Sequence, residues 1–154
     1  MAILNRAMEL DAADATSMAL LACCNAQLGT YHGTSSPGAA RDTALALSLR
    51  AGMLHNSNPL VMAACSTATA LALPADEAEA LVTRALAMDP TSAWAWERRG
   101  FLRLNSPADA DRAITDFRRA LQLRGPRISR ANCFVGIASA HCHAGRRAEA
   151  DLWT

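Results

Sequence analysis

An Arg-Ala pair recurs near the end of four segments whose apolar residues follow a helical period. Ala51, Ala85 and Ala120 of these pairs are spaced by 34 and 35 residues, and Ala7 precedes Ala51 by 44 residues. The longer interval equals one period plus an insertion, for which the Gly-, Ser- and Thr-rich stretch 30–38 has the right length. Such a period indicates a helical-repeat array. The pairs are Arg6-Ala7, Arg50-Ala51, Arg84-Ala85 and Arg119-Ala120.

Turn signals separate segments whose apolar residues recur at three- and four-residue steps, which predicts helices joined by short connections. Ser36-Pro37, Asn58-Pro59 and Ser106-Pro107 each place a capping side chain before a proline, and Ser106 with Asp109 has capping-box spacing. The stretch 30–38 is the one long connection and is expected to be a mobile loop. The predicted helices span residues 2–11, 14–29, 38–54, 59–73, 75–88, 92–104, 108–124, 128–144 and 146–153.

Composition supports an all-α fold and argues against nucleic acid and membranes as partners. Apolar residues make up 51% of the chain, mostly Ala and Leu, and aromatic residues only 5%, a balance that favours closely packed helices over sheets. The net charge is +1 and the basic residues are scattered, so nucleic-acid binding is not expected. Because no apolar stretch reaches the roughly 20 residues of a membrane span, and the first turns are charged, we predict a cytoplasmic protein without membrane contact.

The cysteines and histidines do not form a recognisable metal or redox site. The five cysteines lack CxxC spacing, and most lie in Ala-rich helical runs, where a reduced thiol packs as a small apolar group. Cys133 and His141 are two helical turns apart, but Cys142 and His143 are adjacent and point in different directions. We therefore predict packing and solvent-facing histidines, and no bound metal.

The sequence carries no motif of a known catalytic site. GxSxG, HExxH, GxxxxGK and GxGxxG motifs are all absent from the sequence. Acidic residues such as Asp76, Glu77 and Asp111 stand at predicted helix starts, where they offset the helix dipole. These observations predict a protein that binds rather than one that catalyses, with no cofactor.

The pattern resembles the tetratricopeptide repeat (TPR) family, whose unit is two antiparallel helices with small residues where the helices touch. The third unit carries the resemblance best, with Trp96, Gly100, Ala113, Phe117 and Ala120 at the family's large and small packing positions. Two of its residues depart from the pattern, since Arg99 and Arg103 stand where the family usually has Leu and Tyr, which bears on how tightly this unit packs. The matching residues of the other units are Met18, Leu21, Ala22, Ala44, Ser48 and Ala51; Met62, Cys65, Ser66, Ala78, Val82 and Ala85; and Phe134, Ile137, Ala138, Gly145 and Ala150.

The resemblance implies a single domain in which helix pairs stack as a right-handed α-solenoid. Its units span about residues 15–57, 59–92, 93–127 and 131–154, the last incomplete, and residues 1–12 form the second helix of a preceding unit. We therefore expect the chain to be a fragment of a longer protein. The segment from Gly136 to Ala150 is also similar to repeats that follow effector domains in bacterial adenylate cyclases and winged-helix transcription regulators.

The resemblance further implies that first helices line a concave groove. Their groove positions in the third and fourth units give candidate partner-binding residues, with an aromatic anchor of Trp94 and Phe101 seven residues apart on one helical face. An equally weighted alternative is that the Trp94 and Phe101 side chains pack on the next repeat. Ala19, Cys23, Ala63 and Thr67 stand where some family members clamp a peptide carboxylate, so that mode is not expected. The candidate residues are Trp94, Glu97, Arg98, Phe101, Asn132 and Val135.

The resulting prediction is a protein-interaction scaffold that binds a peptide or partner helix. One alternative is a regulatory or sensor segment of a larger nucleotide cyclase or transcription regulator, answering to a small ligand. A second alternative is self-association through exposed apolar residues of the end repeats, namely Leu4 with Met8 or Leu152 with Trp153.

Overall fold

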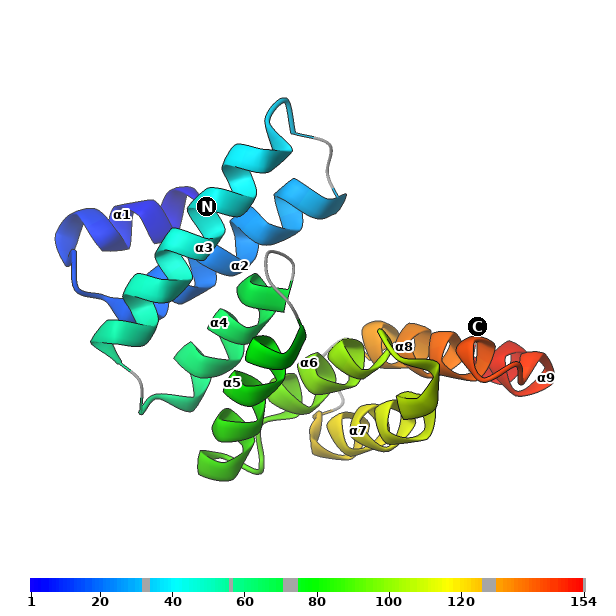
Figure 1. Cartoon of the computed structure of the whole chain (residues 1–154). Coiled ribbons are helices and arrows are strands. Elements are labelled where there is room, and N and C mark those ends of the chain that lie inside the picture. The colour runs from blue at the N-terminus through cyan, green and yellow to red at the C-terminus, as the bar shows by residue number, and fades with distance from the viewer. Residues whose placement is uncertain (32–33, 56, 71–74, 126–129, 154) are drawn as a thin grey trace. The chain divides into compact units, whose positions relative to one another are not determined.

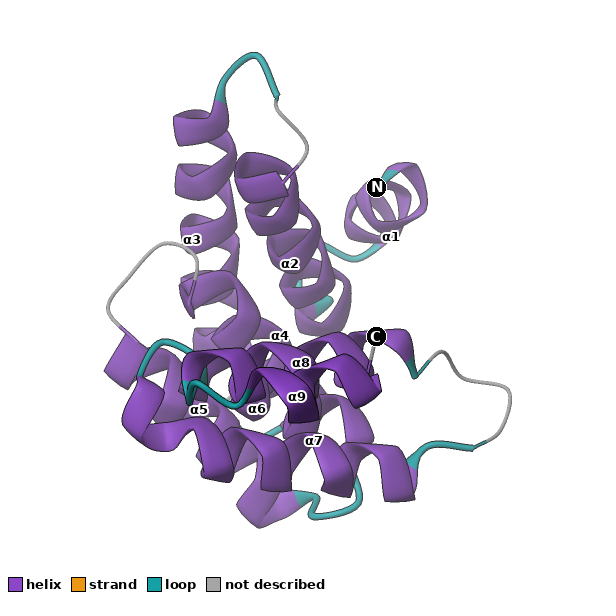
Figure 2. Ribbon diagram, turned by 90° about the vertical axis from the view of Figure 1, so that its right-hand side faces the viewer, coloured by secondary structure: helices purple, strands orange, loops and turns teal. Residues whose placement is uncertain are grey.

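The computed structural model describes residues 1–31, 34–55, 57–70, 75–125 and 130–153, and every regular element in these ranges is helical (Figures 1 and 2). The chain divides into two compact units, Met1–Met88 and Asp89–Thr154. The first unit contains α1 (Ala2–Leu10), α2 (Ala15–Tyr31), α3 (Pro37–Leu54), α4 (Pro59–Ala70) and α5 (Ala75–Met88). The second contains α6 (Ala93–Arg103), the 3-10 turn η1 (Pro107–Asp109), α7 (Ala110–Leu123), α8 (Ala131–His143), α9 (Arg147–Ala150) and the 3-10 turn η2 (Asp151–Trp153).

The predicted all-α fold and the order of its helices are confirmed within the described ranges. Most helix ends fall within a few residues of the expected positions. The predicted helix 146–153 is shorter than expected, because α9 ends at Ala150 and a 3-10 turn follows. Residues 32–33 of the predicted mobile loop, and the expected helix residues 71–73 and 128–129, lie outside the described residues.

The helix starts correct part of the capping prediction. Asn58 caps α4 as expected, since its Oδ1 accepts the backbone N–H groups of Leu60 (2.9 Å) and Val61 (3.3 Å). The side chains of Ser36 and Ser106 make no cap hydrogen bond. The capping-box prediction for Ser106 is wrong because the segment opens with a 3-10 turn, in which the Asp109 N–H bonds the Ser106 carbonyl (3.0 Å).

The repeated alanines mark the surfaces where paired helices meet. In the first unit α2 packs on α3, α4 packs on α5, and α2 and α4 also touch. Ala51 and Ala85 are fully buried, whereas the preceding Arg50 and Arg84 are exposed. An alanine at this position lets two helix backbones approach closely, and the arginine beside it lies outside the contact between the helices. The Arg-Ala repeat is therefore a packing signature.

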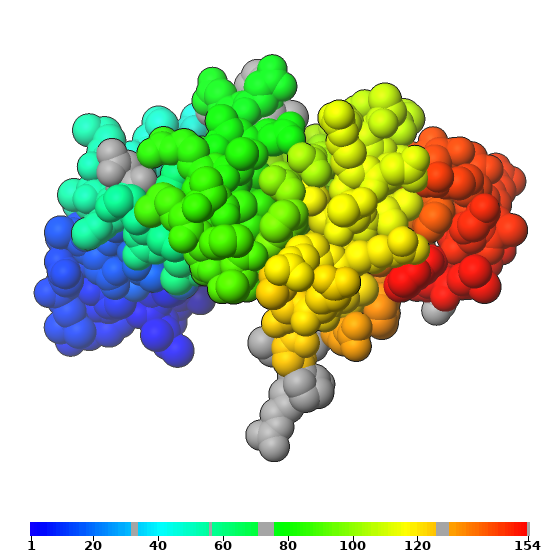
Figure 3. Space-filling view, turned by 90° about the horizontal axis from the view of Figure 1, so that it is seen from below, coloured from blue at the N-terminus to red at the C-terminus, as the bar shows by residue number. Residues whose placement is uncertain are grey.

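The second unit is built around the ring of Phe117. This side chain is fully buried on α7, which covers one face of the unit (yellow in Figure 3). Gly100 of α6 and Gly136 of α8 lie against the ring so closely that a Cβ atom at Gly136 would stand 2.3 Å from its Cζ. Phe101 meets the same ring edge-on, with the centroids 4.9 Å apart. The glycines thus admit an aromatic ring where three helices converge.

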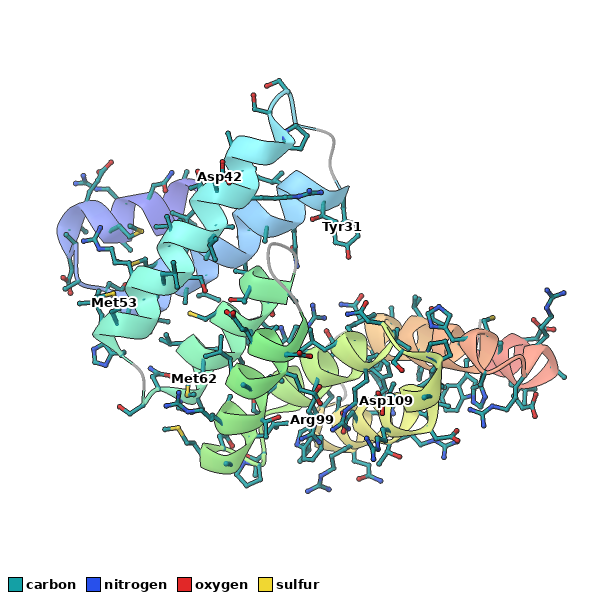
Figure 4. The ribbon with its side chains drawn as sticks, viewed as in Figure 1. Tyr31, Asp42, Met53, Met62, Arg99 and Asp109 are labelled. Carbon is teal, nitrogen blue, oxygen red and sulfur yellow. The ribbon has the colours of Figure 1, made fainter. Side chains whose placement is uncertain are left out.

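A buried ionic cluster accommodates the two arginines that depart from the repeat pattern. Asp116 of α7 is 1% exposed and accepts hydrogen bonds from Arg99 Nε (2.9 Å) and Nη2 (2.8 Å) and from Arg103 Nη1 (2.7 Å). The guanidinium of Arg99, labelled in Figure 4, also stacks 4.5 Å from the centre of the Trp96 ring. The arginines therefore join α6 to α7 instead of loosening this unit.

Candidate functional site

The six candidate partner-binding residues lie on two neighbouring helices of the second unit. Trp94, Glu97, Arg98 and Phe101 belong to α6, whereas Asn132 and Val135 belong to α8. The two helices are in contact, and Asn132 Nδ2 donates a hydrogen bond to Glu97 Oε1 at 3.4 Å. The structure thus brings together residues that the sequence separates by more than thirty positions.

Glu97 is the centre of a buried network that ties three helices together. Its side chain is 2% exposed, and its carboxylate is bound by Arg98 and by Arg124, the residue that ends α7. The Cys133 thiol of α8 donates to Glu97 Oε2 at 3.5 Å. Because all these groups converge on it, the carboxylate of Glu97 fixes the positions of its neighbours and is not presented at the surface.

The five other candidates form a surface that this network supports. The Arg98 guanidinium lies 4.9 Å from the centre of the Phe101 ring, which in turn packs on Phe117. Trp94 is half-buried on the same helix, and Val135 of α8 is 60% exposed. We call Trp94, Arg98, Phe101, Asn132 and Val135 the aromatic face.

The corresponding positions of the first unit offer less to a partner. Ala19 and Ala63 are essentially fully buried, and Cys23 and Thr67 are less than a tenth exposed. Leu60, the other predicted groove position of α4, is an exception, with 43% of its surface exposed. The groove positions of this unit are thus largely occupied by small, covered side chains.

The first unit also contains a cleft that was not predicted, because the sequence analysis sought binding residues only on the first helix of each repeat. A cleft of about 570 Å³ opens between α3 and α5 and is floored by α4. The signal for it was present in the sequence, since Leu49 and Met53 place apolar residues four apart on a face that the repeat pattern leaves to solvent. The lining residues are Ser48, Leu49, Gly52, Met53, Val61, Met62, Cys65, Thr69, Glu77, Ala80, Leu81 and Arg84.

The cysteines are all free thiols in different surroundings. Cys23, Cys65 and Cys133 are buried, Cys24 is half-buried and Cys142 is exposed. Burial and the neighbouring Glu97 carboxylate raise the pKa of Cys133 to about 11, and burial also raises the pKa of Cys65. Both thiols therefore stay protonated at neutral pH and act as packing groups.

We expect alkylation to separate these thiols by rate. At about pH 8, close to the ordinary pKa of a thiol, iodoacetamide should label Cys142 first, whereas Cys133 should react only when the protein unfolds. Peptide mass spectrometry over time measures this order, and the same reaction in urea, where every thiol should react, is the control. Labelling of folded protein at Cys133 as fast as at Cys142 would contradict the network described above.

The described residues contain no metal-binding cluster of three or more His, Cys, Asp and Glu side chains. Cys133 is directed at Glu97, and Cys142 and His143 are exposed at the end of α8. None of the described helices combines the length and apolar character that a membrane crossing requires.

Comparison with known proteins gives a match in structure alone. No protein-family model matches the chain, and no curated protein matches its sequence. A crystal structure of MamA, a TPR-like protein, superposes on 97% of this chain and 80% of its own with a TM-score of 0.61 and 16% identity. A second MamA structure covers 97% of this chain and 74% of its own, with a TM-score of 0.62 and 16% identity. These matches show that the fold is a TPR-like helical repeat.

Proposed function

We propose that this chain is a protein-interaction scaffold that binds a peptide or partner helix on the aromatic face. The observation that carries the proposal is the stacked pair of Arg98 and Phe101, held in place by Glu97 beneath it and flanked by Trp94 and the exposed Val135. The TPR-like fold supports this assignment, because stacked helix pairs form extended binding surfaces. A cytoplasmic location is part of the same proposal.

The physical case is that the face is organised before a partner arrives. Tryptophan and arginine are enriched among residues that dominate binding free energies, and a side chain already held in one rotamer loses little entropy on binding. Arg98 is held by the Glu97 carboxylate on one side and by the Phe101 ring on the other. A partner therefore meets a rigid cationic and aromatic surface with an apolar edge at Val135.

We expect a Trp94→Ala, Val135→Asp double variant to fold and to lose its partner. These two positions are chosen because Glu97 and Phe101 also support the fold, so their replacement would confuse binding with stability. Loss of one dominant aromatic residue lowers affinity by about thirtyfold or more. Pull-down from native cell lysate, with circular dichroism to compare helix content, measures the loss.

A Leu152→Asp variant is the matched control, since Leu152 is an 82% exposed apolar residue of the same unit outside the aromatic face. Proteins captured by wild type and by the control but not by the double variant support the proposal. Equal capture by all three, or capture by none, rejects the aromatic face as the binding surface. The regulatory or sensor function stays a prediction.

A further inference from the structure

The second unit carries a large excess of positive charge. Residues 89–154 contain eleven arginines and seven acidic residues, a net charge of +4, whereas residues 1–88 contain four arginines and seven acidic residues, a net charge of −3. Within the second unit, the stretch 117–148 holds seven arginines and neither aspartate nor glutamate, and it includes all of α8. A local excess of one sign of charge attracts a partner of the opposite sign and speeds its association.

The Glu97 network is itself cationic. Arg98 and Arg124 share one carboxylate, so the three side chains together keep a charge of +1. The side chains of Arg98 and Arg124 are 15% and 9% exposed, so water screens this charge less than it screens the charge of a surface arginine. Arg98 also belongs to the aromatic face. A carboxylate of the partner that meets Arg98 there balances the charge of the network.

A second arginine–aromatic pair lies on α8, next to the aromatic face. Arg130, an exposed residue directly before the first residue of α8, has its guanidinium 5.7 Å from the centre of the Phe134 ring. Phe134 precedes Val135 in the chain and is 36% exposed, so apolar surface continues from one to the other. Cationic and apolar groups therefore alternate along this surface. An acidic peptide with apolar side chains among its carboxylates has the complementary pattern.

Nucleic acid is a poorer match for the same surface. Bases bind to aromatic side chains by stacking on the faces of the rings. The rings of Trp96, Phe101 and Phe134 each have a guanidinium over one face, and Phe101 also meets the ring of Phe117. These rings are already engaged in contacts within the protein, which favours a partner that brings carboxylates and aliphatic groups instead of bases.

A second copy of the chain is also a poorer match. Leu4 and Met8, which were expected to mediate self-association, are half-buried on the helix that packs against α2. Trp153, another residue expected to do so, packs against Phe134 with the ring centroids 5.9 Å apart. Leu152 is 82% exposed, but one leucine covers little area. Self-association through the end repeats therefore stays a prediction.

We propose that the partner of the aromatic face is an acidic peptide segment that places carboxylates against Arg98 and Arg130 and an apolar side chain on Val135. This partner chemistry rests on the function proposed above and deepens it. Guanidinium groups bind carboxylates through paired hydrogen bonds, and a guanidinium already stacked on a ring is held ready for that contact. Raising the salt concentration from about 0.05 M to about 0.5 M should weaken the binding about tenfold or more.

Selection from a library of random short peptides tests the chemistry of the partner. The library is bound to the wild-type chain and, in parallel, to a Trp94→Ala, Val135→Ser variant, which alters the aromatic face without changing its charge. Peptides bound by wild type alone should be enriched in Asp and Glu. Face-dependent peptides that are neutral or basic would overturn the acidic partner and leave the proposed function standing, whereas the absence of any face-dependent peptide would reject both.

Calorimetric titration with the most enriched peptide tests the two arginines. Arg98→Gln leaves Glu97 paired with Arg124, so it orphans no buried charge. This variant and Arg130→Gln should each lower the affinity for the peptide by about tenfold, with unchanged circular dichroism. Arg119→Gln is the matched control, because Arg119 is an exposed arginine of α7 outside the aromatic face.

Three outcomes of this titration contradict the acidic partner. They are equal peptide affinity in wild type and all three variants, tighter binding of a single-stranded thymidine oligonucleotide than of the peptide, and dimers of the chain, seen by sedimentation velocity, that the peptide dissociates. The second outcome would assign the surface to nucleic acid, and the third to another copy of the chain.

Discussion

Replacing Asp116 by alanine should lower the free energy of unfolding of the second unit by about 3 kcal/mol. The substitution removes the carboxylate shared by Arg99 and Arg103, whose side chains are only 15% and 19% exposed. Two guanidinium groups then remain close together in a poorly hydrated place, and this repulsion and desolvation, rather than the lost hydrogen bonds alone, account for the effect.

The measurement is made easier by the distribution of tryptophan. Trp94, Trp96 and Trp153 are the three tryptophans of the chain, and all belong to the second unit. Tryptophan fluorescence in a urea titration therefore reports on this unit, whereas circular dichroism reports on both. Asp116→Ala should lower the urea concentration at which tryptophan fluorescence reports half-unfolding of the second unit. The midpoint for the first unit, followed by circular dichroism, should change less.

Asp111→Ala is the matched control on the same helix. Asp111 also forms an ion pair, with Arg146 at 2.6 Å, but its side chain is 80% exposed, so little stability should be lost. A variant with Arg99→Leu, Arg103→Tyr and Asp116→Leu replaces the whole cluster by apolar groups and should recover most of the stability. If that triple variant is as unstable as Asp116→Ala, orphaned charge is the wrong explanation.

The repeat pattern predicted the fold because it records contacts between helix backbones. Ala85 and Ala120 are fully buried where two helices meet. A small residue is needed there even though the other positions of the repeat vary. The pattern gave no account of Asp116, which reads as an ordinary surface residue of α7. Its partners lie 17 and 13 residues earlier in the chain, and only the packing of α6 on α7 brings them to it.

The use of the candidate site as a binding surface stays a prediction, but one neighbour relation within it follows from the repeat. Glu97 and Asn132 occupy groove positions of successive repeats, and in the structure Asn132 donates a hydrogen bond to Glu97. The burial of Glu97 could not be predicted from the sequence, because it depends on contacts with Arg124 and Cys133, which are 27 and 36 residues further along the chain. The cleft was missed because its existence depends on the separation of α3 from α5, a distance that no periodic pattern specifies.

Gly136→Ala should be as damaging as the loss of a buried charge, at about 3 kcal/mol. The added Cβ would stand 2.3 Å from Cζ of Phe117 and 2.6 Å from Cε1 and Cε2. The ring has no room to retreat, because Gly100 on α6 already lies so close that a Cβ there would be 2.8 Å from Cε1. The same fluorescence-detected urea titration measures the effect.

The opposite result is expected for the same substitution at Gly52, where a new Cβ meets no atom within 4 Å. In that open helical position alanine should stabilise the first unit by up to about 1 kcal/mol, because it has the higher helix propensity.

A smaller side chain at position 117 should relieve the clash at Gly136, so Gly136→Ala should cost much less stability in a Phe117→Leu background. If Gly136→Ala is equally harmful in both backgrounds, the contact with the Phe117 ring does not explain why this position is glycine.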